Sequence, residues 1–215
     1  MTEADVREAL AEVIDPELDR PLVDLGFVTG VTVDGGRVEV ELRLPTYWCS
    51  PNFSWLMASD VREALLRVPE VAEARVTLQD HHASRQISEG VNAGRSFGEV
   101  FGADADCDLE GLRRIFRRKA LVLRQDRLLS SLTGPIPRRV AELPDTPEAR
   151  AYLAVRAELG IDCSPEATAV VDADGSGVDD LEAYRRRARV VRVGMDGNTA
   201  LCRTLFETRY ATEGR

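Results

Sequence analysis

The sequence lacks the patterns that mark several common classes of protein. Its four cysteines, Cys49, Cys107, Cys163 and Cys202, lie far apart without C-x-x-C spacing, which argues against a structural zinc site or a thioredoxin-like motif. No apolar run approaches the length of a membrane span, and the first residues are acidic, unlike a signal peptide. A net charge of -9 gives no general attraction to nucleic acid. We therefore expect a cytoplasmic protein with reduced thiols that binds neither nucleic acid nor membranes.

What remains is an ordinary soluble composition. The chain has 215 residues, of which 44% are hydrophobic and 30% charged, enough for one large domain or two small ones with a core. We find no internal repeat.

The first 80 residues alternate helical and strand patterns. The apolar periodicity and the turn residues predict a helix over Thr2–Val13, strands over Phe27–Val33 and Arg37–Leu44 joined by a tight turn, a helix over Ser54–Val68 and a strand over Val71–Leu78. This order predicts an αββαβ domain with its helices on one face of a small sheet. Because the open edges of such a sheet must be covered, we expect a homodimer.

The rest of the chain is less regular. We expect a partly helical stretch over 84–101, a long helix from Asp106, a helix from Thr146 to Gly160, a strand over Ala167–Val171, a helix over Asp179–Arg187, a strand over Arg189–Val193 and a final segment from Asn198 to Tyr210. The fold class is therefore α+β, with a domain over residues 1–84 and a mixed, largely helical C-terminal extension over 85–215.

The stretch Pro45–Trp55 joins a predicted strand to a predicted helix and contains Cys49. A cysteine at a helix N-terminus is favoured as a thiolate, which can be a nucleophile, a metal ligand or a redox centre. The loop before the first long strand should lie at the same end of the sheet and bring the carboxylates of Asp15, Glu17 and Asp24 towards this thiol, which already has the hydroxyl of Thr46 in its own loop. Carboxylate and thiolate together suit iron or zinc.

A structural interpretation of the same residues stands beside the functional one. Asp15 would then cap a turn before Pro16, Asp24 would satisfy backbone groups, and Cys49 would be a small buried hydrophobe.

Four motifs in order carry a family resemblance. They are Asp15-Pro16-Glu17, the run from Pro21 to Val28, Thr46-x-x-Cys49 and Val68-Pro69-Glu70-Val71. Over residues 1 to about 80 the chain resembles the iron–sulfur cluster assembly domain of the SufT and PaaD proteins. The resemblance implies an αββαβ domain that helps to assemble or deliver clusters on client enzymes. It also implies that Cys49 is the central thiol and that Asp15, Glu17, Asp24 and Thr46 line its site.

The loop departs from the pattern of that family. The family commonly has proline two residues before the cysteine and one after it, whereas Tyr47 and Ser50 stand there in this chain. The loop also carries Tyr47, Trp48, Phe53 and Trp55. Exposed aromatics favour a docking surface, whereas Trp55 also suits a core position.

His81 and His82 are the only histidines and follow the last strand of the first domain. The stretch from Asp80 to Phe97 is similar to the extension of PaaD-like proteins, and the longer architecture resembles forms that accompany diiron monooxygenases. Neutral imidazole is a good iron ligand. Alternatively the two side chains are an exposed pair at a strand end, pointing in opposite directions on an extended chain.

Other patterns indicate structure. Asp172-x-Asp174-x-Ser176-Gly177 begins like a calcium loop, but its later positions do not match, so a tight turn is favoured. The basic run around Arg113–Lys119 is typical of a solvated face, with docking to an acidic surface as the alternative. Cys202, flanked by apolar residues, is interpreted as a packing residue.

Three functional hypotheses follow. The first is a maturation factor that supplies iron or an iron–sulfur cluster, transiently bound by Cys49 with His81 and His82 as candidate ligands, to a client metalloenzyme such as a diiron monooxygenase component. The second is a thiol enzyme with Cys49 as nucleophile and His81 or His82 as base. The third is an adaptor whose C-terminal half grips a partner.

Overall fold

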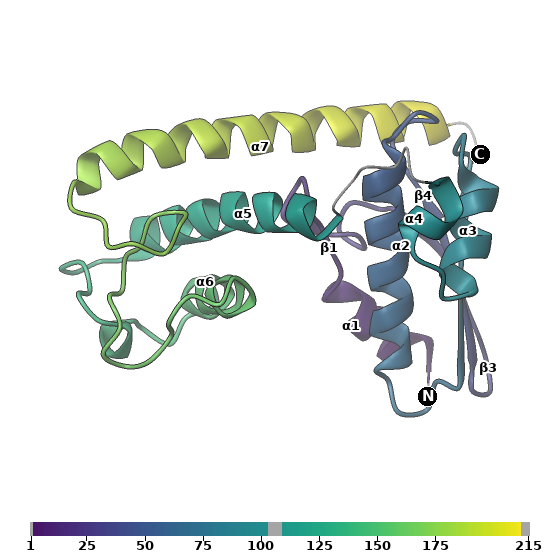
Figure 1. Ribbon diagram of the computed structural model, residues 1–215, viewed down its shortest axis with the longest axis horizontal. Helices are drawn as coiled ribbons and strands as arrows, with labels where there is room; N and C mark the ends of the chain where they lie inside the picture. Colours follow the sequence, from purple (N-terminus) through teal and green to yellow (C-terminus); the bar gives the residue numbers. More distant parts are fainter. Residues whose placement is uncertain (1, 103–108, 212–215) are drawn as a thin grey trace. The chain divides into compact units, whose positions relative to one another are not determined.

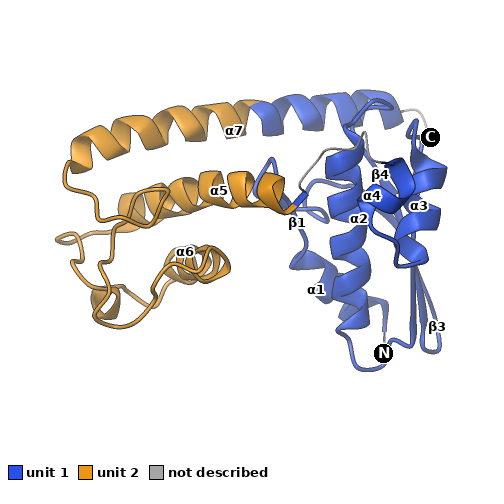
Figure 2. Cartoon of the chain, viewed as in Figure 1, with its two compact units in different colours: residues 1–109, 198–215 blue, residues 110–197 orange. Residues whose placement is uncertain are grey.

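The computed structural model describes residues 2–102 and 109–211, which form two compact units. Unit 1 comprises residues 1–109 and 198–215, and unit 2 comprises residues 110–197 (Figure 2). Each unit has a core of its own. Within the described ranges, no helix is long and apolar enough to cross a membrane.

Unit 1 has the expected order of helices and strands (Figure 1). Its elements are α1 (Glu3–Ala11), β1 (Ile14–Asp15), β2 (Arg20–Pro21), β3 (Val28–Asp34), β4 (Arg37–Arg43), α2 (Pro51–Leu66), β5 (Glu73–Gln79), α3 (Ser84–Asn92) and α4 (Phe97–Phe101). The main sheet has the order β3-β4-β5, with β3 antiparallel and β5 parallel to β4. Strands β1 and β2 form a separate antiparallel pair. The α+β class is confirmed.

Local signals explain where these elements begin. Thr2 and Asp5 form a capping box at the start of α1, with reciprocal side-chain to backbone hydrogen bonds. Gly35, with φ of 56°, makes the turn between β3 and β4. Helix α2 begins at Pro51, three residues before the predicted Ser54, because proline has a suitable φ and needs no amide partner at the first helical position.

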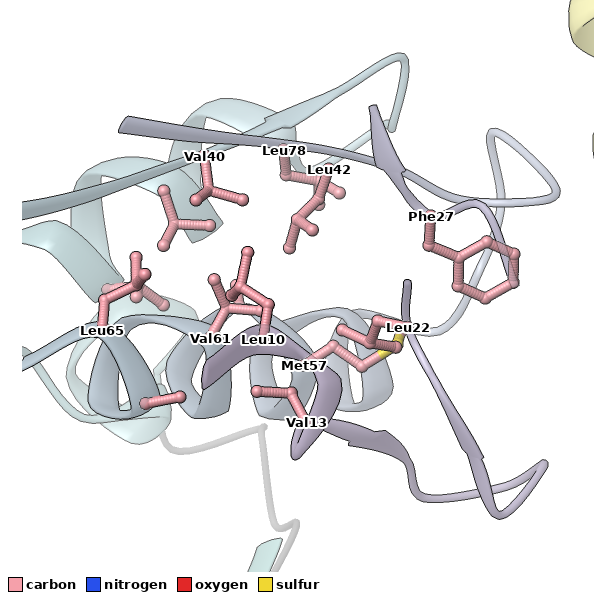
Figure 3. Packing of buried hydrophobic residues seen from close by; sticks show 14 of the residues in the cluster. Leu10, Val13, Leu22, Phe27, Val40, Leu42, Met57, Val61, Leu65 and Leu78 are labelled. Carbon is pink, nitrogen blue, oxygen red and sulfur yellow. The ribbon is translucent and has the colours of Figure 1, made fainter. Parts of the chain in front are cut away.

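The core of unit 1 lies between the sheet and helices α1 and α2 (Figure 3). Val40, Leu42 and Leu78 point from the strands towards Leu10 and Val61 on the helices, and each is at most 3% exposed. Burying one such side chain contributes about 1.5–3 kcal/mol. The buried and polar positions alternate along β4 and β5, so one face of the sheet is packed and the other faces solvent.

Helix α3 covers the outer edge of β5. The side-chain amide of Asn92 donates to the carbonyl of Val76 at 2.8 Å and its oxygen accepts from the Val76 amide at 2.9 Å, while the Ser88 hydroxyl accepts from the Leu78 amide at 3.0 Å. These side chains satisfy backbone groups that a further strand would otherwise pair. The homodimer stays a prediction, and this edge of the sheet does not require it.

Unit 2 is built around helices. Its elements are α5 (Leu109–Ser131), the 3-10 helix η1 (Val140–Glu142), α6 (Pro147–Glu158) and the first part of α7 (Leu181–Tyr210). One core cluster joins α5 to α6 and a second joins α5 to α7. The buried Arg156 donates to the carbonyl oxygens of Thr168 and Asp162, which ties α6 to the following loop.

Two predicted strands of the C-terminal region are wrong. Residues 167–171 form only isolated bridges, Arg139 with Thr168 and Val171 with Gly177. Residues 189–193 lie inside α7, a single helix of 30 residues. The valines suggested a strand, but Tyr184, Ala188, Val191 and Met195 recur at helical spacing, and the first three of these pack in one cluster with α5.

The compact units also divide the chain differently from the expected boundary at residue 84. Trp55 of α2 makes edge-to-face contacts with Phe97 and Phe101 of α4, at centroid distances of 5.6 and 6.1 Å. These contacts attach residues 84–101 to unit 1. The last part of α7, from Asn198, also belongs to unit 1.

Candidate functional site

Three loops of unit 1 meet at one end of the main sheet, where the strands finish. Because β4 and β5 are parallel and β3 is antiparallel to them, the segments after β4, after β5 and before β3 lie at the same end. Backbone hydrogen bonds join them: the His82 amide donates to the Tyr47 carbonyl at 3.1 Å, and the Arg43 amide to the Phe27 carbonyl at 2.9 Å. The expected convergence of the loops is confirmed.

Cys49 lies in the loop after β4, two residues before α2. Its side chain is half-buried, and its Sγ lies 3.3 Å from Oγ1 of Thr46. Ser50, at the N-cap of α2, makes no side-chain capping hydrogen bond, so the first amides of the helix are not capped there and favour negative charge nearby. Cys49 and Thr46 are thus brought together as predicted.

His81 holds the backbone of this loop. It is 3% exposed, and its Nδ1 accepts a hydrogen bond from the Ala83 amide at 3.1 Å. Nε2 therefore carries the proton and donates to the carbonyl of Cys49 at 2.7 Å, with the Ser54 hydroxyl 3.2 Å away. Burial lowers the pKa of His81 below its usual value. Both nitrogens are engaged with the loop itself, and neither ring nitrogen is hydrogen-bonded to the Cys49 thiol.

His82 is exposed and belongs to an aromatic surface. Its ring stacks on Trp48 at a centroid distance of 5.2 Å, and Trp48 packs edge-to-face on Tyr47 at 4.9 Å. Trp48 is 74% exposed and Tyr47 is 46% exposed. We call Tyr47, Trp48 and His82 the aromatic surface; exposed aromatic groups of this kind are typical of docking sites. Trp55, by contrast, is a core residue at 4% exposed.

The two histidine rings do not point in opposite directions. Their centroids are 4.5 Å apart, because Asp80 has a positive φ of 51° and ends the extended chain before them. The alternative of two exposed side chains is therefore wrong for His81 and correct for His82. Their role as metal ligands stays a prediction.

Asp15 is a buried carboxylate. It is 6% exposed, and its Oδ1 accepts hydrogen bonds from the amides of Glu17 at 2.8 Å and Leu18 at 2.9 Å. Burial raises the pKa of Asp15 to about 6, although these two hydrogen bonds oppose the shift. Asp15 therefore caps the turn before Pro16 as predicted. Because its pKa is raised, ionisation of this carboxyl destabilises the folded state.

The last part of α7 lies against the acidic loops. Asn198 donates to Oε1 of Glu17 at 3.5 Å, and Arg203 donates to the backbone carbonyl of Asp24 at 3.2 Å. Phe206 packs on Phe27 at a centroid distance of 5.4 Å. The carboxylate of Asp24 is exposed, so Asp24 contributes mainly its backbone to these contacts.

The same helix brings a second cysteine to the site. Cys202 is half-buried and packs against the core cluster that Cys49 also touches. Burial raises the pKa of the Cys202 thiol to about 11, and the charges of Asp15, Glu17 and Cys49 add to this shift. The packing role of Cys202 is confirmed, but its position beside the predicted site was missed. The helical spacing of Cys202, Phe206 and Tyr210 was the signal that could have revealed it.

The candidate ligands do not form a closed metal site. Within residues 2–102 and 109–211, no three His, Cys, Asp or Glu side chains are grouped so that they could hold a metal ion. The site offers a thiol with a hydroxyl partner, a buried carboxylate and a second thiol. Such a set suits a cargo that brings ligands of its own, as a cluster with bridging sulfides does.

The remaining candidates from the sequence lie elsewhere. Cys163 in unit 2 donates to the carbonyl of Ile161 at 3.3 Å, and Cys107 lies outside the described residues. The Asp172 segment is a turn, as predicted: Asp174 accepts hydrogen bonds from the amide and hydroxyl of Ser176. In the basic run of α5, Arg117 pairs with Glu110 and Glu158 within unit 2.

Comparison with known proteins gives matches to the N-terminal part of the chain. Residues 3–78 match a family model described as "Iron-sulfur cluster assembly protein". The iron–sulfur cluster carrier protein of Mycobacterium leprae is 38% identical over 74 residues, which are 34% of this chain and 19% of that protein. The carrier protein of Deinococcus radiodurans is 38% identical over 68 residues, 32% of this chain and again 19% of its own length.

A shorter relative is covered almost completely. An uncharacterised protein of Methanocaldococcus jannaschii is 31% identical over 90 residues, which are 41% of this chain and 93% of that protein. The match with the carrier proteins, in contrast, spans about a fifth of their length. The matched residues 3–78 contain all three strands of the main sheet except the last residue of β5, and they include the Cys49 loop.

Proposed function

Because the chain belongs to the iron–sulfur cluster assembly protein family through its residues 3–78, we propose that it binds an iron–sulfur cluster, or the iron needed to assemble one, and delivers it to a client metalloenzyme. The observation that carries the proposal is the position of Cys49. The family match spans the αββαβ unit whose converging loops place this thiol beside Thr46 at the entrance of α2. The names of the carrier relatives from Mycobacterium leprae and Deinococcus radiodurans support the same role.

In this proposal Cys49 is the transient ligand of the cargo. Ser50 leaves the first amides of α2 without a side-chain cap, and such amides stabilise negative charge on a cargo bound nearby. The Thr46 hydroxyl hydrogen-bonds the sulfur, and the His81 hydrogen bond fixes the carbonyl of Cys49 and with it the loop. A single anchoring thiol on a fixed loop allows release, since fewer protein ligands must be exchanged when the cargo moves to its client.

The aromatic surface is the proposed docking site for the client. Trp48 and Tyr47 expose large apolar rings one and two residues from Cys49, so a client that covers them also approaches the thiol. Aromatic anchors at the centre of an interface commonly provide much of its binding energy. The finer proposal, that the client is a component of a diiron monooxygenase, is based on the resemblance of residues 80–97 to the PaaD-like extension, and recovery of that component with the chain from its native cell would test it.

Reconstitution tests the proposed role of Cys49. The full chain is incubated anaerobically with ferrous iron and sulfide, desalted, and assayed for visible absorbance, iron and acid-labile sulfide. Wild type and Cys163→Ser should retain a chromophore, because Cys163 lies in unit 2 and bonds a backbone carbonyl. Cys49→Ser should lose most of it. Equal iron and sulfide content in Cys49→Ser and wild type would contradict the proposal.

A further inference from the structure

Unit 2 contains a pocket with three arginine side chains in its lining. Its volume is about 410 Å³, and all of its lining residues lie between residues 110 and 197, so unit 2 forms it alone. Pockets of this size commonly hold a small molecule. One wall is the face of α5 that carries Arg114, Arg117 and Arg118, and the opposite wall includes the end of α6 and the residues that follow it.

The wall on α5 concentrates positive charge. Its three arginines stand three and four positions apart, a spacing that places side chains on one face of a helix. From Arg113 to Lys119 the sequence has five basic residues and no acidic one. A ligand in the pocket therefore meets several guanidinium groups at once.

The carboxylates that line the pocket already have partners. Arg117 forms ion pairs with Glu110 at 3.3 Å and with Glu158 at 3.0 Å. The carboxylate of Asp174 accepts hydrogen bonds from the amide of Ser176 at 2.9 Å and from its hydroxyl at 2.6 Å. These contacts hold Arg117 in place and leave the pocket's other two arginines without a carboxylate bound to them.

Arg114 and Arg118 are exposed and available to a ligand. Within the part of the chain that the structure describes, neither forms an ion pair or a side-chain hydrogen bond. Hydrogen bonds from Ser176 lower the pKa of Asp174, and the charge of Arg118 adds to this shift, so Arg118 lies near the rim that Asp174 forms. The charge that lacks a partner in this pocket is positive, which favours an anion as its ligand.

Guanidinium groups match phosphate in charge and in geometry. Their planar N–H donors form paired, charge-assisted hydrogen bonds to two phosphate oxygens. Arg114 and Arg118 are one helical turn apart, about 6 Å along the axis, so one phosphate can contact both. Leu159 and Ile161 also line the pocket and offer apolar contact to the remainder of a small molecule.

We propose that this pocket of unit 2 binds the phosphate group of a small molecule, with Arg114 and Arg118 as the residues that hold it. A concave site suits a small molecule better than the flat surface of an acidic protein. No residue of the Cys49 site lines the pocket, so the inference is independent of the proposed function and gives the C-terminal extension a binding role of its own.

Calorimetric titration of the full chain at constant ionic strength tests the inference. The probes are adenosine monophosphate, adenosine and inorganic phosphate. Adenosine monophosphate should bind saturably at one site, and adenosine should not bind. Tighter binding of the monophosphate than of inorganic phosphate supports an organic phosphate as ligand, and equal binding supports the free anion. Absence of saturable binding of both phosphate probes would overturn the proposal.

Three matched substitutions locate the site. Arg114→Gln and Arg118→Gln should each weaken binding of the phosphate probe by about tenfold or more, because each removes charge-assisted hydrogen bonds. Arg185→Gln is the control, since Arg185 is an exposed arginine of unit 2 that does not line the pocket, and it should bind as wild type does. Equal losses in all three variants would show a general attraction of anions and would contradict the proposal. Far-UV circular dichroism checks that the variants are folded.

Discussion

Replacement of Asp15 by asparagine should stabilise the metal-free protein at neutral pH. Asp15 is 6% exposed, and its pKa is raised by burial from 3.8 to about 6. The folded state therefore binds a proton more tightly than the unfolded state does. Stability from this group is complete below pH 3.8 and is lost as the pH rises through about 6.

The size of the effect follows from the two pKa values. A pKa difference of one corresponds to about 1.4 kcal/mol, so the ionised Asp15 costs about 3 kcal/mol above pH 6. Asparagine keeps an oxygen that can accept from the Glu17 and Leu18 amides but carries no charge. Because those hydrogen bonds are weaker to a neutral acceptor, we expect Asp15→Asn to gain about 2 kcal/mol at pH 7.

Urea unfolding of both proteins between pH 4 and pH 8 measures this difference. Subtracting the two curves isolates Asp15, because His81 and the other titrating groups are common to both proteins. The difference should be small near pH 4 and should reach its full size above pH 6. An Asp15→Asn protein that is less stable than wild type at pH 7, or a difference independent of pH, would refute the reasoning.

Three further predictions are measured by urea unfolding at pH 7, and the third also at lower pH. Trp55→Ala should cost about 3–5 kcal/mol and Trp48→Ala less than about 0.5 kcal/mol, because Trp55 is 4% exposed and Trp48 74%; equal costs would contradict the assignment of Trp55 to the core. Gly90→Ala should cost about 1–3 kcal/mol, since its Cβ would lie 2.7 Å from a carbon of the Trp55 ring, whereas Gly194→Ala, with open space around it, should gain up to about 1 kcal/mol. His81→Ala should cost about 2–4 kcal/mol, because it leaves the Cys49 carbonyl and the Ala83 amide without their partner. The pKa of His81 is lowered in the folded state from its usual 6.5, so wild type loses stability as the pH falls below 6.5 and the cost of the substitution should shrink. A cost that grows in acid would contradict this prediction.

The N-terminal unit was predictable because its signals are local. The alternation of Val38, Val40 and Leu42, the turn at Gly35 and the helical stripe containing Val61 each depend on neighbouring residues. The convergence of the loops then follows from strand order. Cys49 and Thr46 could be paired for the same reason, since they are three positions apart in the sequence.

The features that the sequence did not predict depend on contacts between residues far apart in the chain or on backbone conformation. The valines of 189–193 favour a strand locally, and only packing of α7 against α5 decides for a helix. The orientation of His81 depends on the left-handed backbone conformation of Asp80, which the pattern of side chains does not predict. Cys202 meets the site through contacts such as Asn198 to Glu17, which join residues 181 positions apart.

Transfer of the cargo tests the central claim most directly. The reconstituted full chain is mixed anaerobically with an apo iron–sulfur acceptor protein in the presence of a chelator that captures free iron, and cluster formation on the acceptor is followed over time. We predict that wild type and Cys163→Ser transfer a cluster faster than free iron and sulfide do under the same conditions, and that Cys49→Ser does not. Transfer by Cys49→Ser at the wild-type rate would contradict the account.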